Sequence, residues 1–427
     1  MCKIKNFMAI MLTAAAFAAI AVSCGNDPEP EKPVEVATVT VSPATLTLTA
    51  GETQTLTAEA LPAEAEDKTL TWSSSDAAVA TVNAQTGEVT AVAEGEASIT
   101  ATAANGITGS CALTVVRTPD VYVSIVEWNG DNGVVSLWKN GAVQRLTDGT
   151  NYSSANSVYV SGSDEYVAGL ETTGDYRVAT LWRNGTAQRL TDGTSHAGAN
   201  SVYVSGGNVY VAGYKLDASY NAEAVLWTNG TAQRLSDGKE ASVSSVYVSG
   251  SNVYVAGHEM NTGYNPKATL WKNGTAQQLT DVTNSYAYSV YVSGNDVYVA
   301  GYETNVNNYW VATLWKNGTA LPLTDGTNNA IARSVYVSGG DVYVAGFEHI
   351  NGVNVATLWK NGVVQRLTDG TKSAEAYPVF VSGGDVYVGG YEANANGLNV
   401  ATLWKNGEAQ RLTDGTNHAH ASSVFVK

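Results

Sequence analysis

The stretch that decides the fold reads Val355-Ala356-Thr357-Leu358-Trp359-Lys360-Asn361-Gly362, and Gln365-Arg366-Leu367-Thr368-Asp369-Gly370 follows shortly after it. Near-copies of this unit fill the second part of the chain. The tryptophan of the unit recurs at Trp138, Trp182, Trp227, Trp271, Trp315, Trp359 and Trp404. Successive tryptophans lie 44 or 45 residues apart. A fixed period of this size is typical of a repeat architecture, so the unit is the first guide to the fold.

One unit, residues 334–371, contains four short runs of apolar, aromatic and β-branched residues that turns separate. These runs predict strands at Ser334–Val337, Val342–Phe347, Val355–Trp359 and Val364–Leu367. Asn361-Gly362 between the last two is typical of a type I′ hairpin turn, because both of its central residues need positive φ. Four antiparallel strands per unit predict one blade of a β-propeller, with the tryptophan packed between blades.

The repeat array starts and finishes within a unit. It begins at Asp120-Val121-Tyr122-Val123, which corresponds to the second strand, and ends at Ser423-Val424-Phe425-Val426, which corresponds to the first. We therefore expect residues 118–427 to form a seven-bladed β-propeller of four-stranded blades, closed by the C-terminal strand. Closure removes the open sheet edges that promote aggregation. The order of turns resembles NHL-type propellers, and Ala-Thr-Leu-Trp-Lys-Asn-Gly is similar to extracellular HAF-type repeats; both resemblances imply a scaffold.

Residues 36–117 alternate apolar and polar residues in short runs, which predicts a β-sandwich and makes the whole chain all-β. Thr71-Trp72-Ser73-Ser74-Ser75-Asp76 and Gly95-Glu96-Ala97-Ser98-Ile99-Thr100-Ala101 resemble the group 2 bacterial Ig-like domain. That family implies an extracellular spacer or adhesin-associated module without chemistry of its own. Trp72 and Cys111 are interpreted as core residues.

The N-terminal segment has the features of a targeting signal. Lys3 and Lys5 precede an apolar run, so residues 1–23 are predicted to be a signal peptide. Ala21-Val22-Ser23-Cys24-Gly25 resembles the lipobox of bacterial lipoproteins, which implies lipidation of Cys24; an ordinary secretory leader is the alternative. Residues 24–35 form an acidic, proline-rich tether. Its resemblance to surface-export signals of Bacteroidota lipoproteins implies lipid anchoring in the outer membrane at the cell surface, with a periplasm-facing position as the alternative.

Composition and motifs exclude several function classes. The 39 acidic residues outnumber the 23 basic residues and give a net charge of −16, which argues against nucleic-acid binding. The sequence shows no Ser/His/Asp assembly, Cys/His metal site or phosphate-binding glycine loop. We therefore expect a monomeric, non-catalytic protein without cofactor or metal. A polysaccharide-active enzyme stays open as an alternative, because propeller active sites gather residues from several blades.

The turns of the repeat predict two different faces. The Ser-Gly-Xaa-Asp/Asn and Asn-Gly turns barely change between units, whereas the loops at the opposite end differ in every unit. Binding residues prefer loops held on a rigid scaffold; drift in loops without a role is the alternative. The aromatic candidates on these loops are Trp128, Tyr152, Tyr176, Tyr220, Tyr264, Tyr286, Tyr288, Tyr309 and Trp310. Aromatic rings among Asn and Asp suit an extracellular glycan, and they suit a protein partner of a scaffold or adhesin equally well.

Two recurring carboxylates are interpreted as structural. The aspartate of Thr-Asp-Gly, Asp369 in the clearest unit, is expected to accept hydrogen bonds from backbone N–H groups of its turn. A glutamate follows the second strand of most units, but Lys215 replaces it in one unit, which argues against a shared metal site.

Overall fold

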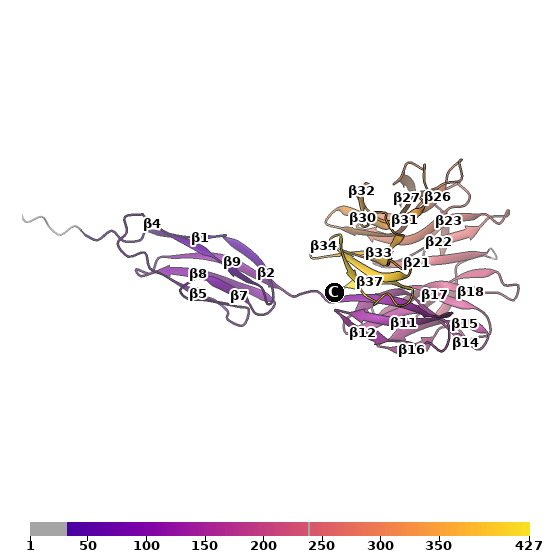
Figure 1. Cartoon of the computed structure of the whole chain (residues 1–427), viewed down its shortest axis with the longest axis horizontal. Coiled ribbons are helices and arrows are strands. Elements are labelled where there is room, and N and C mark those ends of the chain that lie inside the picture. The colour runs from indigo at the N-terminus through magenta and orange to yellow at the C-terminus, as the bar shows by residue number, and fades with distance from the viewer. Residues whose placement is uncertain (1–31, 238–239) are drawn as a thin grey trace, which may run out of the picture. The chain divides into compact units, whose positions relative to one another are not determined.

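The computed structural model describes residues 32–237 and 240–427, and its described part is built of strands without a helix. The all-β prediction is confirmed. None of the described residues forms a helix that could cross a membrane. The chain divides between Thr118 and Pro119 into two compact units (Figure 1). The predicted signal peptide and Cys24 lie outside the described residues, and the end of the tether, residues 32–35, is exposed and outside any strand.

The first unit is a sandwich of short strands around one core. Its strands are β1 (Thr38–Ser42), β2 (Thr45–Thr49), β3 (Thr53–Thr55), β4 (Thr57–Leu61), β5 (Leu70–Ser74), β6 (Ala80–Val82), β7 (Glu88–Ala91), β8 (Gly95–Ala103) and β9 (Thr108–Val116). They pair as β1-β4, β2-β9-β8-β5 and β3-β7-β6. Trp72 is 6% exposed and Cys111 is fully buried in the shared core, which confirms both as core residues.

The second unit contains seven four-stranded sheets, which we number I to VII. Sheet I combines β10 (Val121–Asn129), β11 (Asn132–Lys139) and β12 (Ala142–Arg145) with the last strand, β37 (Ala419–Val426). Sheet II holds β13 (Ser153–Ser161), β14 (Asp164–Thr173), β15 (Tyr176–Arg183) and β16 (Thr186–Arg189). Sheet III holds β17 (Ala197–Ser205), β18 (Asn208–Leu216), β19 (Ala222–Thr228) and β20 (Thr231–Arg234). Sheet IV holds β21 (Ala241–Ser249), β22 (Asn252–Met260), β23 (Pro266–Lys272) and β24 (Thr275–Gln278).

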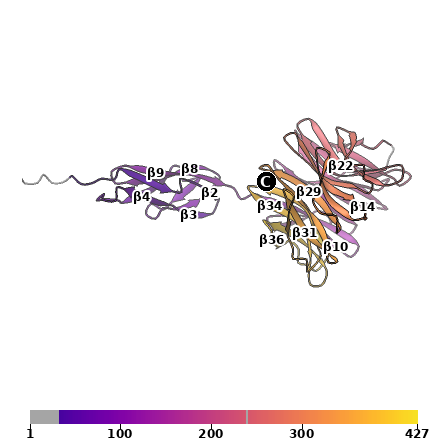
Figure 2. The same ribbon diagram turned by 90° about the horizontal axis from the view of Figure 1, so that it is seen from above.

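The remaining sheets follow the same plan. Sheet V holds β25 (Tyr286–Ser293), β26 (Asp296–Thr304), β27 (Trp310–Lys316) and β28 (Thr319–Pro322). Sheet VI holds β29 (Ala330–Ser338), β30 (Asp341–Ile350), β31 (Val353–Lys360) and β32 (Val363–Arg366). Sheet VII holds β33 (Ala374–Ser382), β34 (Asp385–Ala393), β35 (Asn399–Lys405) and β36 (Glu408–Arg411). Seen from above, the strands of this unit splay outward (Figure 2).

The first strand of each repeat lies innermost and contacts the first strands of the two neighbouring sheets. We call these seven strands the inner strands; they are β13, β17, β21, β25, β29, β33 and β37. β37 contacts both β33 and β13, so the contacts run around the whole unit although each sheet is itself open. β37 pairs antiparallel with β10, from Val121 opposite Val426 to Glu127 opposite Ala419.

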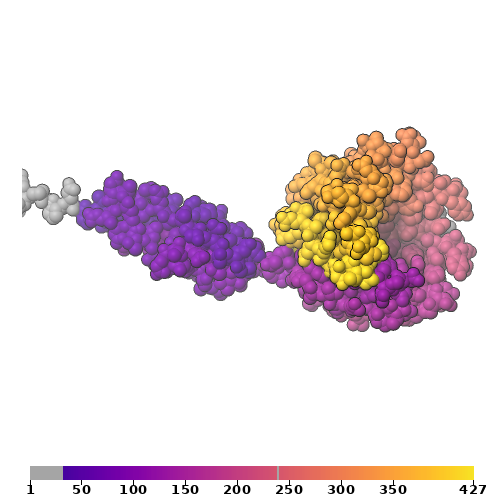
Figure 3. Space-filling model, viewed as in Figure 1, coloured from indigo at the N-terminus to yellow at the C-terminus, as the bar shows by residue number. Residues whose placement is uncertain are grey.

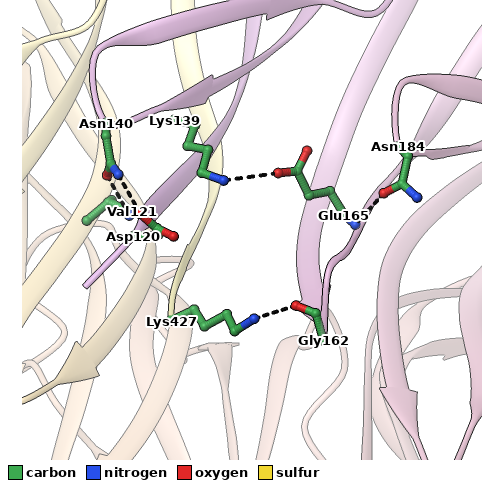
Figure 4. A network of polar contacts seen from close by, with 8 residues as sticks. All are labelled: Asp120, Val121, Lys139, Asn140, Gly162, Glu165, Asn184 and Lys427. Atoms are coloured by element: carbon green, nitrogen blue, oxygen red, sulfur yellow. Dashed lines mark hydrogen bonds and ion pairs between the residues drawn. The ribbon is translucent and has the colours of Figure 1, made fainter. Parts of the chain in front are cut away.

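Polar contacts join Lys427 to the start of the repeat array and to sheet II; Figure 4 shows the contacts of Lys427 with Gly162 and of Lys139 with Glu165. The backbone N–H of Asp120 donates to the carbonyl of Lys427 at 2.8 Å, and the reverse hydrogen bond is 2.9 Å long. The Lys427 ammonium donates to the carbonyl of Gly162, and Lys139 pairs with Glu165 at 3.5 Å. Sheet I is therefore held to sheet II by side chains from both ends of the array.

The uniform turns meet at one end of every sheet, which we call the uniform face. Asn361 and Gly362 have φ values of 52° and 78°, so the type I′ prediction is confirmed. The Asn361 side chain accepts the N–H of Val342 at 2.8 Å and donates to Asp341 at 2.7 Å. The same asparagine-to-Asp/Asn bond recurs in all seven sheets. This bond explains why both turns keep their residues from unit to unit.

The recurring tryptophans pack between sheets, as predicted. Trp359 of sheet VI is fully buried against Tyr298 and Leu314 of sheet V. Equivalent clusters place Trp227 against sheet II and Trp404 against sheet VI. Burying an aromatic side chain of this size contributes several kcal/mol, so these contacts are a main source of stability between sheets.

A serine on the inner strands links each sheet to the next. Its hydroxyl oxygen accepts the N–H of a valine on the following inner strand, as Ser334 does from Val379 at 3.2 Å. Six such bonds are present among the described residues. Sheet VII has Pro378 in place of the serine, so the equivalent bond to Val424 is missing. Gly389 of β34 makes room for this proline, because a Cβ at Gly389 would lie 2.9 Å from Pro378 Cγ.

The effects of Gly389→Ala and Pro378→Ser on the free energy of unfolding should therefore depend on each other. Alone, Gly389→Ala should lower the free energy of unfolding by about 1–3 kcal/mol, because the methyl group overlaps the proline ring. With Pro378→Ser the same change should cost less than about 1 kcal/mol, and the new hydroxyl can accept the Val424 N–H. Urea unfolding of the four proteins in a double-mutant cycle measures the coupling. An equal cost of Gly389→Ala in both backgrounds would show that the two residues do not depend on each other.

Candidate functional site

Each inner strand carries a bulge near its start. The pairing register with the neighbouring strand shifts by a residue there, for example between Ala155 and Ser157. A bulge re-aims the side chain that it leaves unpaired. The bulged residues of sheets I to VII are Ser422, Asn156, Asn200, Ser244, Tyr288, Arg333 and Tyr377, with Pro378 also in the last shift.

These seven residues line one cavity of about 350 Å³, together with the inner-strand serines. We call this cavity the well. It lies toward the starts of the inner strands, which is the end formed by the variable loops, and we call that end the variable face. Figure 3 shows the second unit hollowed between its yellow C-terminal segment and its pink middle segment. A volume of this size lies within the range of about 300–1,000 Å³ that is typical of ligand pockets.

A ring of aromatic side chains follows the serines along the inner strands, toward the uniform face. Its members are Tyr159, Tyr203, Tyr247, Tyr291, Tyr336, Phe380 and Phe425. Neighbouring ring centroids lie 4.8 Å apart at Tyr159–Tyr203 and 5.1 Å apart at Phe380–Phe425. Burial raises the pKa of the Tyr203 hydroxyl above its ordinary value, so the ring is uncharged at neutral pH.

One side of the well is lined by small amides and hydroxyls. Asn156 donates to the carbonyl of Ala199 at 2.9 Å and to Asn200 Oδ1 at 3.3 Å. Asn200 in turn donates to the carbonyl of Val243 at 2.7 Å. These amide groups connect neighbouring inner strands, so much of their hydrogen-bonding capacity is used within the fold.

The opposite side holds the arginine cluster, which consists of Arg333, Tyr288, Tyr377, Phe347 and Glu375. The Arg333 guanidinium lies 4.8 Å from the ring centroid of Tyr288 and 5.8 Å from those of Phe347 and Tyr377. Its Nη2 lies 3.8 Å from Glu375 Oε2, and its Nε is buried without a hydrogen-bond partner among the described residues. Cation–π contacts thus hold the charge in place at the well.

More aromatic residues extend the arginine cluster on both flanks. On one flank, Tyr286 stacks on Tyr302 at 5.3 Å, and Trp310 lies 5.5 Å from Tyr302. On the other flank, His420 lies 4.8 Å from Trp128 and 5.6 Å from Tyr377. Burial lowers the pKa of His420 to about 4, so its imidazole is neutral at physiological pH. The flanks of the arginine cluster are therefore aromatic and uncharged.

The structure separates the nine aromatic candidates into groups. Tyr288 lines the well, and Tyr286, Trp310 and Trp128 lie on the flanks of the arginine cluster. Tyr309, next to Trp310, is 40% exposed. Tyr264 is 79% exposed, and Tyr152 lies half-buried beneath Arg177 at 5.1 Å.

Tyr176 and Tyr220 line a second cavity of about 460 Å³, which also includes His196, Lys215 and Asp217. Tyr220 is 71% exposed and adopts a φ of 64°, in a turn where Asp217 accepts the N–H of Asn221 at 2.9 Å. Lys215, which replaces the recurring glutamate, thus lines the same cavity as two of the predicted aromatic residues.

Arg333 and Tyr377 were missed by the reasoning from sequence, because the candidates were sought on loops and both residues lie on strands. A signal was nevertheless present. The inner strand keeps its Ser-Val-Tyr-Val core nearly constant, yet the residue before that core changes from asparagine to tyrosine to arginine between units.

The recurring carboxylates have the structural contacts expected of them. Asp369 accepts the backbone N–H of Thr371 at 2.9 Å and its hydroxyl at 2.7 Å. These hydrogen bonds hold the pKa of Asp369 below its ordinary value. Among the recurring glutamates, Glu127 accepts a hydrogen bond from Asn417 at 3.1 Å and Glu259 is buried. No group of three or more His, Cys, Asp or Glu within the described ranges is placed to hold a metal ion.

Comparison with known proteins identifies the first unit. The model of the bacterial Ig-like domain (group 2) matches residues 35–115, so this segment is a group 2 bacterial Ig-like domain. No curated protein sequence matches the chain.

Solved structures with propeller domains are similar to this chain at low identity. The Pyrococcus horikoshii acylaminoacyl peptidase is 14% identical with a TM-score of 0.47, and the match covers 70% of this chain and 51% of that one. The β-propeller domain of the Trilobed protease from Pyrococcus furiosus is 12% identical with a TM-score of 0.43, covering 76% and 96%. A putative TolB from Agrobacterium tumefaciens is 11% identical with a TM-score of 0.38, covering 73% and 99%.

These neighbours correct one prediction. This chain spans about half the length of the acylaminoacyl peptidases that it resembles. The expectation of a non-catalytic protein, drawn from missing motifs, is contradicted because peptidases are among the structural neighbours. At such low similarity the neighbours assign no activity to this chain.

Proposed function

We propose that the second unit is a closed seven-bladed β-propeller that binds an extracellular glycan on its variable face, with the well as the centre of the site. The Ig-like domain serves as a spacer, and lipidation of Cys24 anchors the protein in the outer membrane at the cell surface. The supporting observation is the well itself. Seven closely similar sheets bring seven side chains to one cavity, and these include Arg333 beside Tyr288 and Tyr377.

The chemistry of the well supports a sugar as the ligand. Tyr288 and Tyr377 line the well, and aromatic rings are surfaces on which the apolar face of a pyranose can stack. The inner-strand serines add hydroxyl groups, which both donate and accept hydrogen bonds, as sugar hydroxyls do. Serine oxygens such as that of Ser334 already accept a backbone N–H, so their hydroxyl hydrogens remain as donors.

Glycan binding in the well should depend on its aromatic walls. We expect residues 32–427, which comprise both units, to bind a subset of a glycan array. Tyr288→Ala combined with Tyr377→Ala should weaken that binding at least about tenfold, which corresponds to 1.4 kcal/mol. Tyr309→Ala combined with Trp310→Ala tests the flank of the site in the same way.

Tyr264→Ala is the matched control, because Tyr264 is 79% exposed on the same face and does not line the well. The Tyr264→Ala variant should bind glycans as tightly as the unmodified protein does. An array without any bound glycan would overturn the proposed function. Unchanged binding by both double variants would show that glycans bind elsewhere.

A further inference from the structure

We infer that the well recognises a carboxylate group on its glycan, and that Arg333 is the residue that binds this group. The inference rests on the proposed function and names the class of sugar: an acidic residue such as a uronic acid. Arg333 is the only charged residue among the seven bulged residues of the inner strands, all of which the structure describes. A positive charge at this point contrasts with the net charge of −16 on the whole chain.

The Arg333 guanidinium has hydrogen-bond donors to spare. Arginine carries five N–H donors in a rigid fork that matches a carboxylate. The Nε of Arg333 has no hydrogen-bond partner within the described part of the chain. Its Nη2 lies 3.8 Å from Glu375 Oε2, beyond hydrogen-bond distance. The rings of Tyr288, Phe347 and Tyr377 hold the charge by cation–π contacts, which give its N–H groups no oxygen acceptor.

Glu375 balances the charge of Arg333 but is held by other partners. Its Oε1 accepts a hydrogen bond from Asn354 at 2.7 Å, and Asn354 is itself held by His349 at 2.9 Å. Burial, and after it the nearby Glu375 carboxylate, raise the pKa values of the Tyr377 and Tyr391 hydroxyls above their ordinary value. Glu375 is therefore fixed beside Arg333 without occupying its donors.

The shape of a carboxylate suits the Arg333 guanidinium. Glu375 Oε2 lies 3.8 Å from Arg333 Nη2 and partly offsets its charge. A planar carboxylate also accepts two parallel N–H bonds from one guanidinium, whereas its sugar ring can stack on Tyr288 or Tyr377.

The test compares oligosaccharides that end in glucuronic acid with the same chains ending in glucose, and with sulfated chains, on residues 32–427. We expect the acidic chains to bind at least tenfold more tightly than the neutral chains. Arg333→Gln should abolish this difference, and Arg333→Lys should restore part of it. Arg177→Gln is the control, because it removes an exposed arginine of the variable face that does not line the well, and it should leave the difference unchanged.

Glu375→Gln keeps the inference testable if Arg333→Gln does not fold. This change removes the competing negative charge, so it should strengthen binding of the glucuronic acid chains severalfold and leave binding of the neutral chains unaltered. Equal binding of acidic and neutral chains, or tighter binding of sulfated chains, would overturn the carboxylate assignment and leave glycan binding in place. No binding of any chain would overturn the proposed function as well.

Discussion

Removal of residues 421–427 should lower the melting temperature of the second unit by about 10 °C or more. The deletion takes away most of β37, the innermost strand of sheet I, and with it the buried Val424 and Val426. Burying a side chain of this kind contributes about 1.5–3 kcal/mol, and in a domain of this size 1 kcal/mol corresponds to about 2–4 °C. The loss of Phe425 also interrupts the aromatic ring between Phe380 and Tyr159.

Circular dichroism melts of the truncated chain measure this effect. Lys427→Ala is the matched control, since it removes the ammonium contact with Gly162 and keeps the strand; it should shift the melt by only a few degrees. A peptide of residues 418–427 added in trans should raise the melting temperature of the truncated chain again. An unchanged melt after truncation would mean that β37 does not hold the unit together.

Gly346→Ala should destabilise the protein by about 3 kcal/mol or more, at the upper end of overpacking effects. Gly346 lies on β30 opposite the bulge of β29, where a Cβ would stand 1.9 Å from the carbonyl oxygen of Ile331. That oxygen belongs to the backbone of a paired strand, so it can move only if the bulge moves. The equivalent glycine of sheet V, Gly301, has the same contact with Tyr286 at 1.9 Å.

Gly339→Ala is the control for the stability cost of replacing a glycine that has positive φ but no close neighbour. Gly339 has a φ of +59° and nothing within 4 Å of its Cβ position, so its cost should be the roughly 1 kcal/mol of a strained backbone. Urea unfolding of both variants gives the comparison. If Gly346→Ala costs no more than Gly339→Ala, the close approach at the bulge is not a constraint on the fold.

The regular parts of the fold were predictable because they depend on neighbours in sequence. Asn361-Gly362 needs positive φ at both residues, and this local requirement gives the hairpin in the structure. The regular spacing of the tryptophans likewise predicted one sheet per repeat, and the structure has one four-stranded sheet for each tryptophan. Each tryptophan packs on the preceding sheet, as Trp359 does on sheet V. The first unit followed from alternation of apolar and polar residues around Trp72.

The well was not predictable from the same reasoning, because it depends on pairing between strands. A shift of one residue between Ala332 and Ser334 decides that Arg333 lines the cavity, and a strand without a bulge would orient it differently. Exposure on loops was also a poor guide. Tyr264 and Tyr288 are both tyrosines in the variable part of a repeat. Only Tyr288 lies beside Arg333.

Hydrogen–deuterium exchange of residues 32–427, with and without the most tightly bound oligosaccharide of the array, is the most direct test of ligand binding in the well. We predict slower exchange of backbone amides around Tyr288, Arg333 and Tyr377 when the oligosaccharide is bound. The Asn-Gly turns of the uniform face should exchange at unchanged rates. Slower exchange at those turns, with no change around Arg333, would contradict a binding site in the well.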